Sequence, residues 1–213
     1  MKQSIFLAIV LFFQTLPPTA AQNATEILAK ATAVYNQSNG MTASFTLHTR
    51  SEVQQVSESF EGIIQMKADK FTLSTPDVKT WYDGTTQWTY VEHTEEVNVS
   101  TPEGDELQFT NPAILLGSYQ KDFTAALKGE TTAANGKAAY IIELTPKKKT
   151  NIVRVELQIE KYAHLPVRIY VESKNKLSNT IQISRIKTNA HLPDQLFAFP
   201  KADYPHAEIV DLR

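Results

Sequence analysis

The sequence contains no cysteine among its 213 residues. No disulfide can form, no cysteine can act as a nucleophile, and no cysteine can carry the lipid anchor of a bacterial lipoprotein. An excess of charge of one sign is also lacking, because 21 Lys and Arg residues balance 23 Asp and Glu residues. Since nucleic-acid binding depends on clustered cations that neutralise phosphates, we expect no nucleic-acid partner.

Long apolar runs are lacking everywhere except at the N-terminus. Lys2 precedes an apolar run over residues 5–16, Pro17 and Pro18 follow it, and small residues then precede Gln22. This order is typical of a cleavable signal peptide, whereas a membrane-spanning helix needs about 20 apolar residues. We therefore predict a signal peptide over 1–21 and a single exported domain over 22–213.

Motifs of enzyme chemistry are also missing. None of the five histidines forms a convincing helical metal motif with another His, Asp or Glu three or four residues away; they are His48, His93, His164, His191 and His206. There is no G-x-S-x-G sequence, and Gly104 and Gly117 lack the spacing of a phosphate-binding loop. We expect no catalytic residues, no metal and no cofactor.

Helical periodicity occurs twice. Apolar residues at Ile27, Leu28, Ala31, Val34 and Tyr35 form one stripe that ends at Asn39-Gly40. A second helix is predicted to begin at Asn111-Pro112, since proline favours the first helical position. It is expected to extend through Phe123, Ala126 and Leu127 to Gly129.

Most of the remaining chain alternates apolar and polar residues, which predicts strands. These lie at 41–49, 60–66, 71–73, 80–82, 86–91, 97–99, 139–144, 153–159, 167–171 and 181–183. Gly62 suggests a bulge or bend, and Asp83-Gly84 suggests a two-residue hairpin turn. The alternation of Ile181 and Ile183 shifts by one residue at Ile186, which suggests a bulge. We read Trp81, Tyr82, Trp88 and Tyr90 as a cross-strand cluster, with stacking on sugars or bases as the alternative.

Several segments together resemble the periplasmic outer-membrane lipoprotein carrier (LolA-like) family. Residues 60–76 resemble its central signature, 81–90 its Asp-Gly hairpin with aromatic flanks, and 43–46 its first strand. Residues 111–116 lie where the family has a lid helix, and 196–200 resemble its closing strand. The resemblance runs from about Ala24 to Leu212.

The resemblance implies a mainly β (α+β) fold. A single curved antiparallel sheet would form an unclosed β-barrel, with an N-terminal helix and a lid helix over the cavity. The family's members have an Arg in the turn before the aromatic strand, which hydrogen-bonds the lid and couples its opening to cargo release. Here the turn reads Lys67-Ala68-Asp69-Lys70, with Ala68 at the Arg position.

The function implied is a monomeric periplasmic carrier of acylated lipoproteins, with no enzymatic activity. It would receive cargo released by an inner-membrane ABC transporter and pass it to an outer-membrane acceptor. Lid residues are expected at Ile114, Leu115, Leu116 and Tyr119. The acyl chains are expected to contact apolar residues of the concave face: Phe45, Leu47, Phe60, Ile64, Met66, Phe71, Leu73, Trp88 and Tyr90.

Two alternatives remain open. The first is an envelope protein that binds or senses lipids or lipoproteins on the same open barrel. The second is a secreted hydrolase with acidic and aromatic residues on the sheet, which a cluster of strongly perturbed carboxylates in a polar cleft would favour.

Overall fold

The computed structural model describes residues 20–102, 107 and 112–213. Two α-helices and 12 strands make up most of this part of the chain. In order, these are α1 (Ala20–Gln37), β1 (Met41–Ser51), β2 (Val56–Lys67), β3 (Lys70–Ser74), β4 (Val78–Tyr82), β5 (Gln87–Val91), β6 (Glu96–Ser100), α2 (Pro112–Asp122), β7 (Phe123–Thr132), β8 (Ala138–Pro146), β9 (Ile152–Glu160), β10 (Pro166–Ser173), β11 (Leu177–Thr188) and β12 (Glu208–Asp211).

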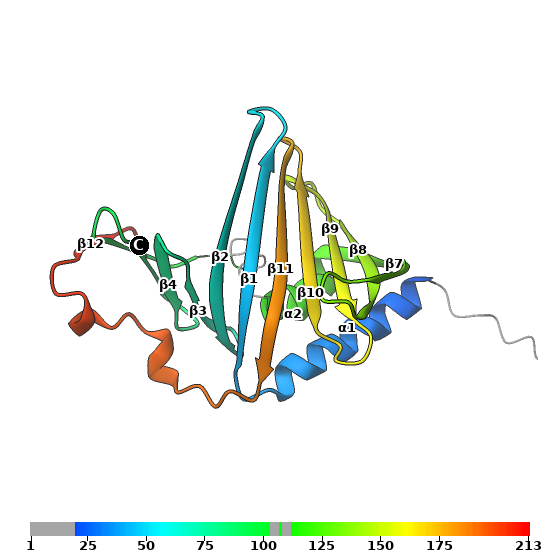
Figure 1. The fold of residues 1–213 in the computed structure, drawn as a ribbon, viewed down its shortest axis with the longest axis horizontal. Helices are drawn as coiled ribbons and strands as arrows, with labels where there is room; N and C mark the ends of the chain where they lie inside the picture. Colours follow the sequence, from blue (N-terminus) through cyan, green and yellow to red (C-terminus); the bar gives the residue numbers. More distant parts are fainter. Residues whose placement is uncertain (1–19, 103–106, 108–111) are drawn as a thin grey trace, which may run out of the picture.

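All 12 strands belong to one curved sheet that does not close on itself (Figure 1). Their order is β12-β6-β5-β4-β3-β2-β1-β11-β10-β9-β8-β7, so the central neighbours β1 and β11 come from opposite ends of the domain. Every pairing is antiparallel except that of β12 with β6. The predicted open antiparallel sheet is therefore confirmed.

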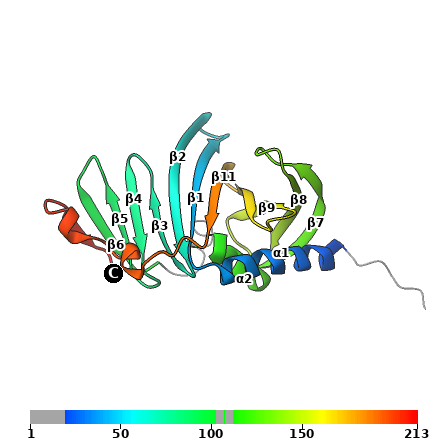
Figure 2. The ribbon, with the colours of Figure 1, turned by 60° about the horizontal axis from the view of Figure 1, so that its bottom comes forward.

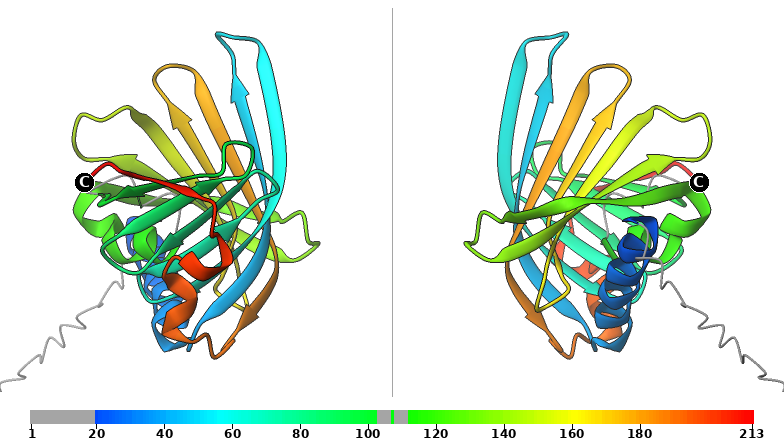
Figure 3. Two further views of the ribbon diagram at one scale, coloured as in Figure 1. Left: turned by 90° about the vertical axis from the view of Figure 1, so that its left-hand side faces the viewer. Right: turned by 90° about the vertical axis from the view of Figure 1, so that its right-hand side faces the viewer.

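The two helices lie across the concave face of the sheet (Figures 2 and 3). Apolar side chains of α1 and α2 form one continuous core with the concave residues of β1–β4 and β7–β11. The predicted apolar stripe of α1 explains this contact, since Ala24, Leu28 and Ala31 are fully buried. No helix among the described residues has the length and apolarity needed to cross a membrane.

The second helix is shorter than predicted. It ends at Asp122, and Phe123 begins β7, so the expected continuation through Ala126 and Leu127 to Gly129 is wrong. The segment also alternates at Phe123, Ala125 and Leu127, and strand pairing with β8 uses this period of two. The apolar pattern of residues 123–129 fits both a helix and a strand. Pairing with β8 satisfies their backbone hydrogen bonds as a strand.

The local predictions at turns are partly correct. Lys187 pairs with Thr42 and Ser184 with Ser44, so the bulge predicted near Ile186 is confirmed. The β4–β5 hairpin has a four-residue loop in place of the predicted two-residue turn, since Tyr82 pairs with Gln87. The β1–β2 register is continuous through Gly62, so of the predicted bulge or bend at this glycine the bulge is excluded.

The C-terminal segment crosses from the end of β11 to the far edge of the sheet (Figure 1). It forms the short 3-10 helices η2 (Asp194–Phe197) and η3 (Lys201–Asp203) before β12 pairs with β6. The expected closing strand at 196–200 is wrong, and β12 closes this edge instead. The predicted signal peptide, 1–21, falls mostly on residues 1–19, which lie outside the described part of the chain, so it remains a prediction.

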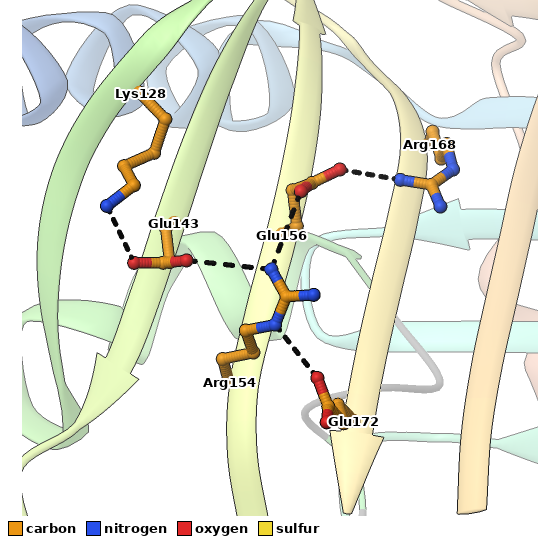
Figure 4. Close-up of polar contacts among 6 residues, drawn as sticks. All are labelled: Lys128, Glu143, Arg154, Glu156, Arg168 and Glu172. Carbon is orange, nitrogen blue, oxygen red and sulfur yellow. Dashed lines mark hydrogen bonds and ion pairs between the residues drawn. The ribbon is translucent and has the colours of Figure 1, made fainter.

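The convex face of β7–β10 carries charged side chains that pair with one another (Figure 4). Arg154 reaches Glu172 at 2.9 Å, and Arg168 reaches Glu156 at 2.7 Å. The hydrogen bond from Arg154 to Glu172 raises the pKa of the Arg154 guanidinium. This face therefore meets water through paired charges, as the alternation of the strands predicts, and the apolar side chains turn to the concave face.

Candidate functional site

An apolar cavity of about 220 Å³ lies against the concave face, near the centre of the sheet. Every lining residue is apolar: Phe45, Leu47, Phe60, Ile64, Leu73, Pro112, Ile169, Ile181 and Ile183. Pro112 is the first residue of α2, so this helix contributes to the wall. Because the wall consists of apolar side chains, the cavity can accept a hydrocarbon and offers water few partners.

Five of the nine predicted concave residues line this cavity, namely Phe45, Leu47, Phe60, Ile64 and Leu73. Phe71 and Met66 share their face, because Met66 pairs with both Phe71 and Met41. Both are nevertheless packed into the core; the ring centroids of Phe71 and Tyr82 lie 5.4 Å apart. Neither residue lines this cavity, although Met66 lines a second pocket described below.

The prediction that Trp88 and Tyr90 lie on the concave face is wrong. Phe71 pairs with Tyr82, which places Tyr82 on the concave side, and the adjacent Trp81 faces the opposite way. Trp88 pairs with Trp81 and therefore lies on the convex face, as does Tyr90 two residues later. There they form an apolar cluster with Trp81, Val97 and Val99, covered by Phe199 and Tyr204 of the C-terminal segment.

Four residues of the cavity wall were not among the predicted set: Pro112, Ile169, Ile181 and Ile183. The alternation of residues 167–171 and 181–183 predicts that Ile169, Ile181 and Ile183 lie on the apolar faces of two strands. Their position beside Phe45 and Leu47 depends on the pairing of β11 with β1, more than 100 residues apart in the chain. No local pattern encodes that pairing.

The predicted lid residues lie on α2. Leu115, Leu116 and Tyr119 are buried in the core, and Ile114 packs against it. The hydroxyl of Thr32 in α1 lies 2.8 Å from the carbonyl oxygen of Leu28 and 3.2 Å from that of Leu116, so it can donate to either. This contact links the two helices over the concave face.

The turn between β2 and β3 is tied to the C-terminal segment. Lys67 Nζ donates to the carbonyl oxygen of Leu192 at 3.0 Å and forms an ion pair with Asp194 at 2.8 Å. Lys70 forms an ion pair with the same carboxylate at 3.3 Å. Both lysines therefore bind this segment. Hydrogen bonds from the lysines, that of Lys67 first, lower the pKa of the Asp194 carboxyl.

A second pocket, of about 260 Å³, separates this turn from the lid. Ala68 and Ile114 both line it, as do Tyr35 and Met41. Burial raises the pKa of the Tyr35 phenol above its usual value. The short side chain of Ala68 thus leaves open the space where the resemblance implies an arginine that reaches the lid.

Charged groups of the described residues pair mainly with one another. No three His, Cys, Asp or Glu side chains in this part of the chain come together as a metal site requires. Carboxylates with a displaced pKa have it lowered by a neighbouring cation: Glu26 by Lys30, Asp194 by Lys67, and Asp211 by Arg213. All three carboxylates are exposed, so these shifts come from ion pairs at the surface.

Comparison with known proteins agrees with this arrangement. Residues 15–175 match the family described as Outer membrane lipoprotein carrier protein LolA. No curated protein matches the chain in sequence. Among solved structures, an uncharacterized conserved protein from Thermus thermophilus has a TM-score of 0.61 at 18% identity, with 89% of this chain and 99% of that chain covered.

Two further structures are similar over nearly their whole lengths. A DUF1329 family protein from Desulfovibrio piger has a TM-score of 0.50 at 13% identity, with 85% of this chain and 98% of that chain covered. The LolA superfamily protein NE2245 from Nitrosomonas europaea has a TM-score of 0.47 at 14% identity, with 83% and 97% covered. At such identities a structural likeness concerns the fold alone. Because the family match spans more than half of the chain, this protein belongs to the outer membrane lipoprotein carrier protein LolA family.

Proposed function

We propose that the protein is a periplasmic carrier that holds the acyl chains of lipoproteins in the apolar cavity and shuttles them from the inner to the outer membrane. It would load from an inner-membrane lipoprotein-releasing ABC transporter and unload to an outer-membrane acceptor. The observation that carries the proposal is the apolar wall of the cavity beneath α2. Membership of the family supports the same role.

The size of the cavity suits transient binding. A methylene occupies about the volume of a water molecule, about 30 Å³, so 220 Å³ accepts about seven methylenes. Burial of about seven methylenes contributes about 6 kcal/mol, from which the entropic cost of association is subtracted. Binding of one such segment is therefore weak enough for handover, and longer or additional chains would require α2 to move.

The short side chain of Ala68 affects how the lid is held. The α1–α2 contact through Thr32 takes the place of a latch from the β2–β3 turn. A neutral hydrogen bond of this kind contributes about 1 kcal/mol, so it opposes opening of α2 only weakly. We infer that cargo release in this protein depends less on a polar latch than on competition for the acyl chain.

A pair of neighbouring residues on β11 provides the test. Ile181 lines the cavity, and Thr180 faces the convex side of the same strand. Ile181→Glu places a carboxylate against the acyl chain and is expected to abolish binding of a fluorescent palmitoyl probe, while Thr180→Glu retains it. Equal binding by both variants would refute the cavity as the site.

Cargo identity is tested separately by isolating the protein from native envelopes. Mass spectrometry of copurifying molecules is expected to find acylated lipoproteins. Recovery of a regulatory membrane protein in their place would support the sensing alternative. Cell fractionation with and without residues 1–21 tests the predicted export.

A further inference from the structure

The sheet divides into two branches along β2. Strand β3 pairs with β2 only from Ile63 to Lys67, so residues 56–62 have β1 on one side and no described strand on the other. The β1–β2 hairpin stands above its neighbours at this point (Figures 1 and 3). Residues 56–61 are all exposed. The other free edges differ, because β7 is in contact with α1 and β12 has only four residues.

The free edge presents unpaired backbone groups in a regular array. Lys67 and Lys70 are the last paired residues before the two-residue turn from β2 to β3, and such a closing pair is hydrogen-bonded through its backbone. Because the direction of the backbone groups alternates along a strand, the N–H and C=O groups of odd-numbered β2 residues point to the β3 side. Above the fork, the N–H and C=O groups of Ser57, Ser59 and Glu61 therefore point outward. Residues 56–62 contain no proline, lysine or bulge, and the charged residues on this edge are Glu58 and Glu61.

This edge adjoins the apolar cavity. Phe60 lies on the free part of β2, is 39% exposed, and lines the cavity together with Ile64. On the other face, a cleft of about 330 Å³ runs between Gly62 and Pro76 at the fork. A molecule whose hydrocarbon part fills the cavity would therefore leave it past Phe60, directly beside the unpaired backbone.

We propose that the peptide segment next to the acyl group of a lipidated cargo binds as an added strand along residues 56–62 of β2. This inference rests on the proposed function, since it takes the acyl chain to occupy the cavity. Pairing through the main chain is largely independent of side chains, so one edge can accept cargoes of different sequence. A second copy of the chain fits less well, because antiparallel self-pairing centred on Ser59 would place Glu58 diagonally opposite Glu58 of the other copy on the same face.

Two synthetic probes test the proposal on the mature protein. The first is a dipalmitoylglyceryl cysteine amide, and the second carries the same lipidated cysteine followed by eight neutral residues. We expect the lipopeptide to bind at least tenfold more tightly than the lipid alone. We also expect it to slow amide hydrogen exchange at Ser57, Ser59 and Glu61.

The Ser59→Pro variant removes one outward N–H without touching the cavity, and Ser59→Ala is its matched control. Ser59→Pro should lose the advantage of the lipopeptide and bind the lipid amide within twofold of the wild type. If Ser59→Pro lowers thermal stability, the exchange measurement on the unaltered protein decides the question.

The remaining outcomes separate the two proposals. Equal affinity for both probes in the wild type, or no effect of Ser59→Pro, would overturn the added strand and leave the carrier intact. Failure of both probes to bind would overturn the carrier and the added strand with it. A dimer formed through β2, seen by sedimentation and not displaced by the lipopeptide, would also overturn the added strand.

Discussion

The ring of Phe45 occupies the place where residue 62 would carry a side chain. A β-carbon built on Gly62 would lie 2.5 Å from Cζ of Phe45 and 2.6 Å from the carbonyl oxygen of Ser74. Only glycine lets the ring and the end of β3 approach β2 so closely, at the point where the sheet forks. Phe45 also lines the apolar cavity, so this contact determines the shape of the proposed site.

Gly62→Ala is therefore expected to destabilise the protein by about 1–3 kcal/mol, as overpacking typically does. It should also displace the Phe45 ring and weaken binding of an acyl probe. Thermal unfolding and probe titration measure the two effects. Gly117→Ala is the control, because no atom lies within 4 Å of its added β-carbon and alanine favours a helix by about 0.5–1 kcal/mol. Equal stability of Gly62→Ala and the wild type would contradict the close approach.

The two tryptophans are expected to be insensitive to cargo. Trp81 and Trp88 lie on the convex face, where the ring centroids of Trp81 and Phe199 are 5.4 Å apart. Saturation with a palmitoyl probe should leave their fluorescence maximum unchanged. Phe60→Trp adds a reporter at the border of the cavity, whose emission should shift to shorter wavelength on binding. A shift in the wild type of the same size would indicate that acyl chains bind the convex face.

A latch can be restored at the β2–β3 turn. Ala68→Arg places a guanidinium in the 260 Å³ pocket that Ala68 shares with Ile114 of the lid. Its planar set of donors can reach carbonyl groups of α2, so we expect slower amide exchange in α2 and slower release of an acyl probe. Ala68→Lys is the control of similar length without the planar fork. If Ala68→Arg releases the probe as fast as the wild type, the turn has no influence on the lid.

The C-terminal segment should loosen at low pH. The pKa of Asp194 is lowered in the folded protein by Lys67 and Lys70, so its contribution to stability is fully present above the unfolded pKa near 4. That contribution is lost as the pH falls through the lower folded pKa. Asp194→Asn removes it at every pH, so at pH 7 we expect a few-fold faster proteolysis after residue 190 than in the wild type. Identical cleavage of both proteins at pH 7 would show that these ion pairs do not hold the segment.

The sequence predicts the strands well, because their alternation arises from burial on one face. It does not say which face is buried. Trp88 and Tyr90 share a face as predicted, but the register with Trp81 places that face outward, and a shift of one residue would reverse it. The C-terminal residues Phe199 and Tyr204 cover these rings, and no local pattern reveals that contact.

Helix α2 shows a second limit. The apolar residues around Phe123 fit both a helical and a strand period, and pairing with β8 decides between them. The cavity shows a third limit of prediction from sequence. Its wall brings β1 together with β10 and β11, which are distant in the chain. Apolar residues that line a space and apolar residues that fill one have the same pattern, as Leu73 and Phe71 illustrate.

Photochemical labelling tests the acyl-chain site most directly. The protein is saturated with a palmitoyl probe that carries a diazirine in the middle of the chain, irradiated, and mapped by mass spectrometry. We expect saturable adducts on the residues of the cavity wall, among them Phe45, Leu47, Phe60, Ile64 and Ile181. Adducts confined to the convex face, at Trp88 or Tyr90, or labelling that unlabelled lipid does not displace, would contradict an acyl-chain site in the cavity.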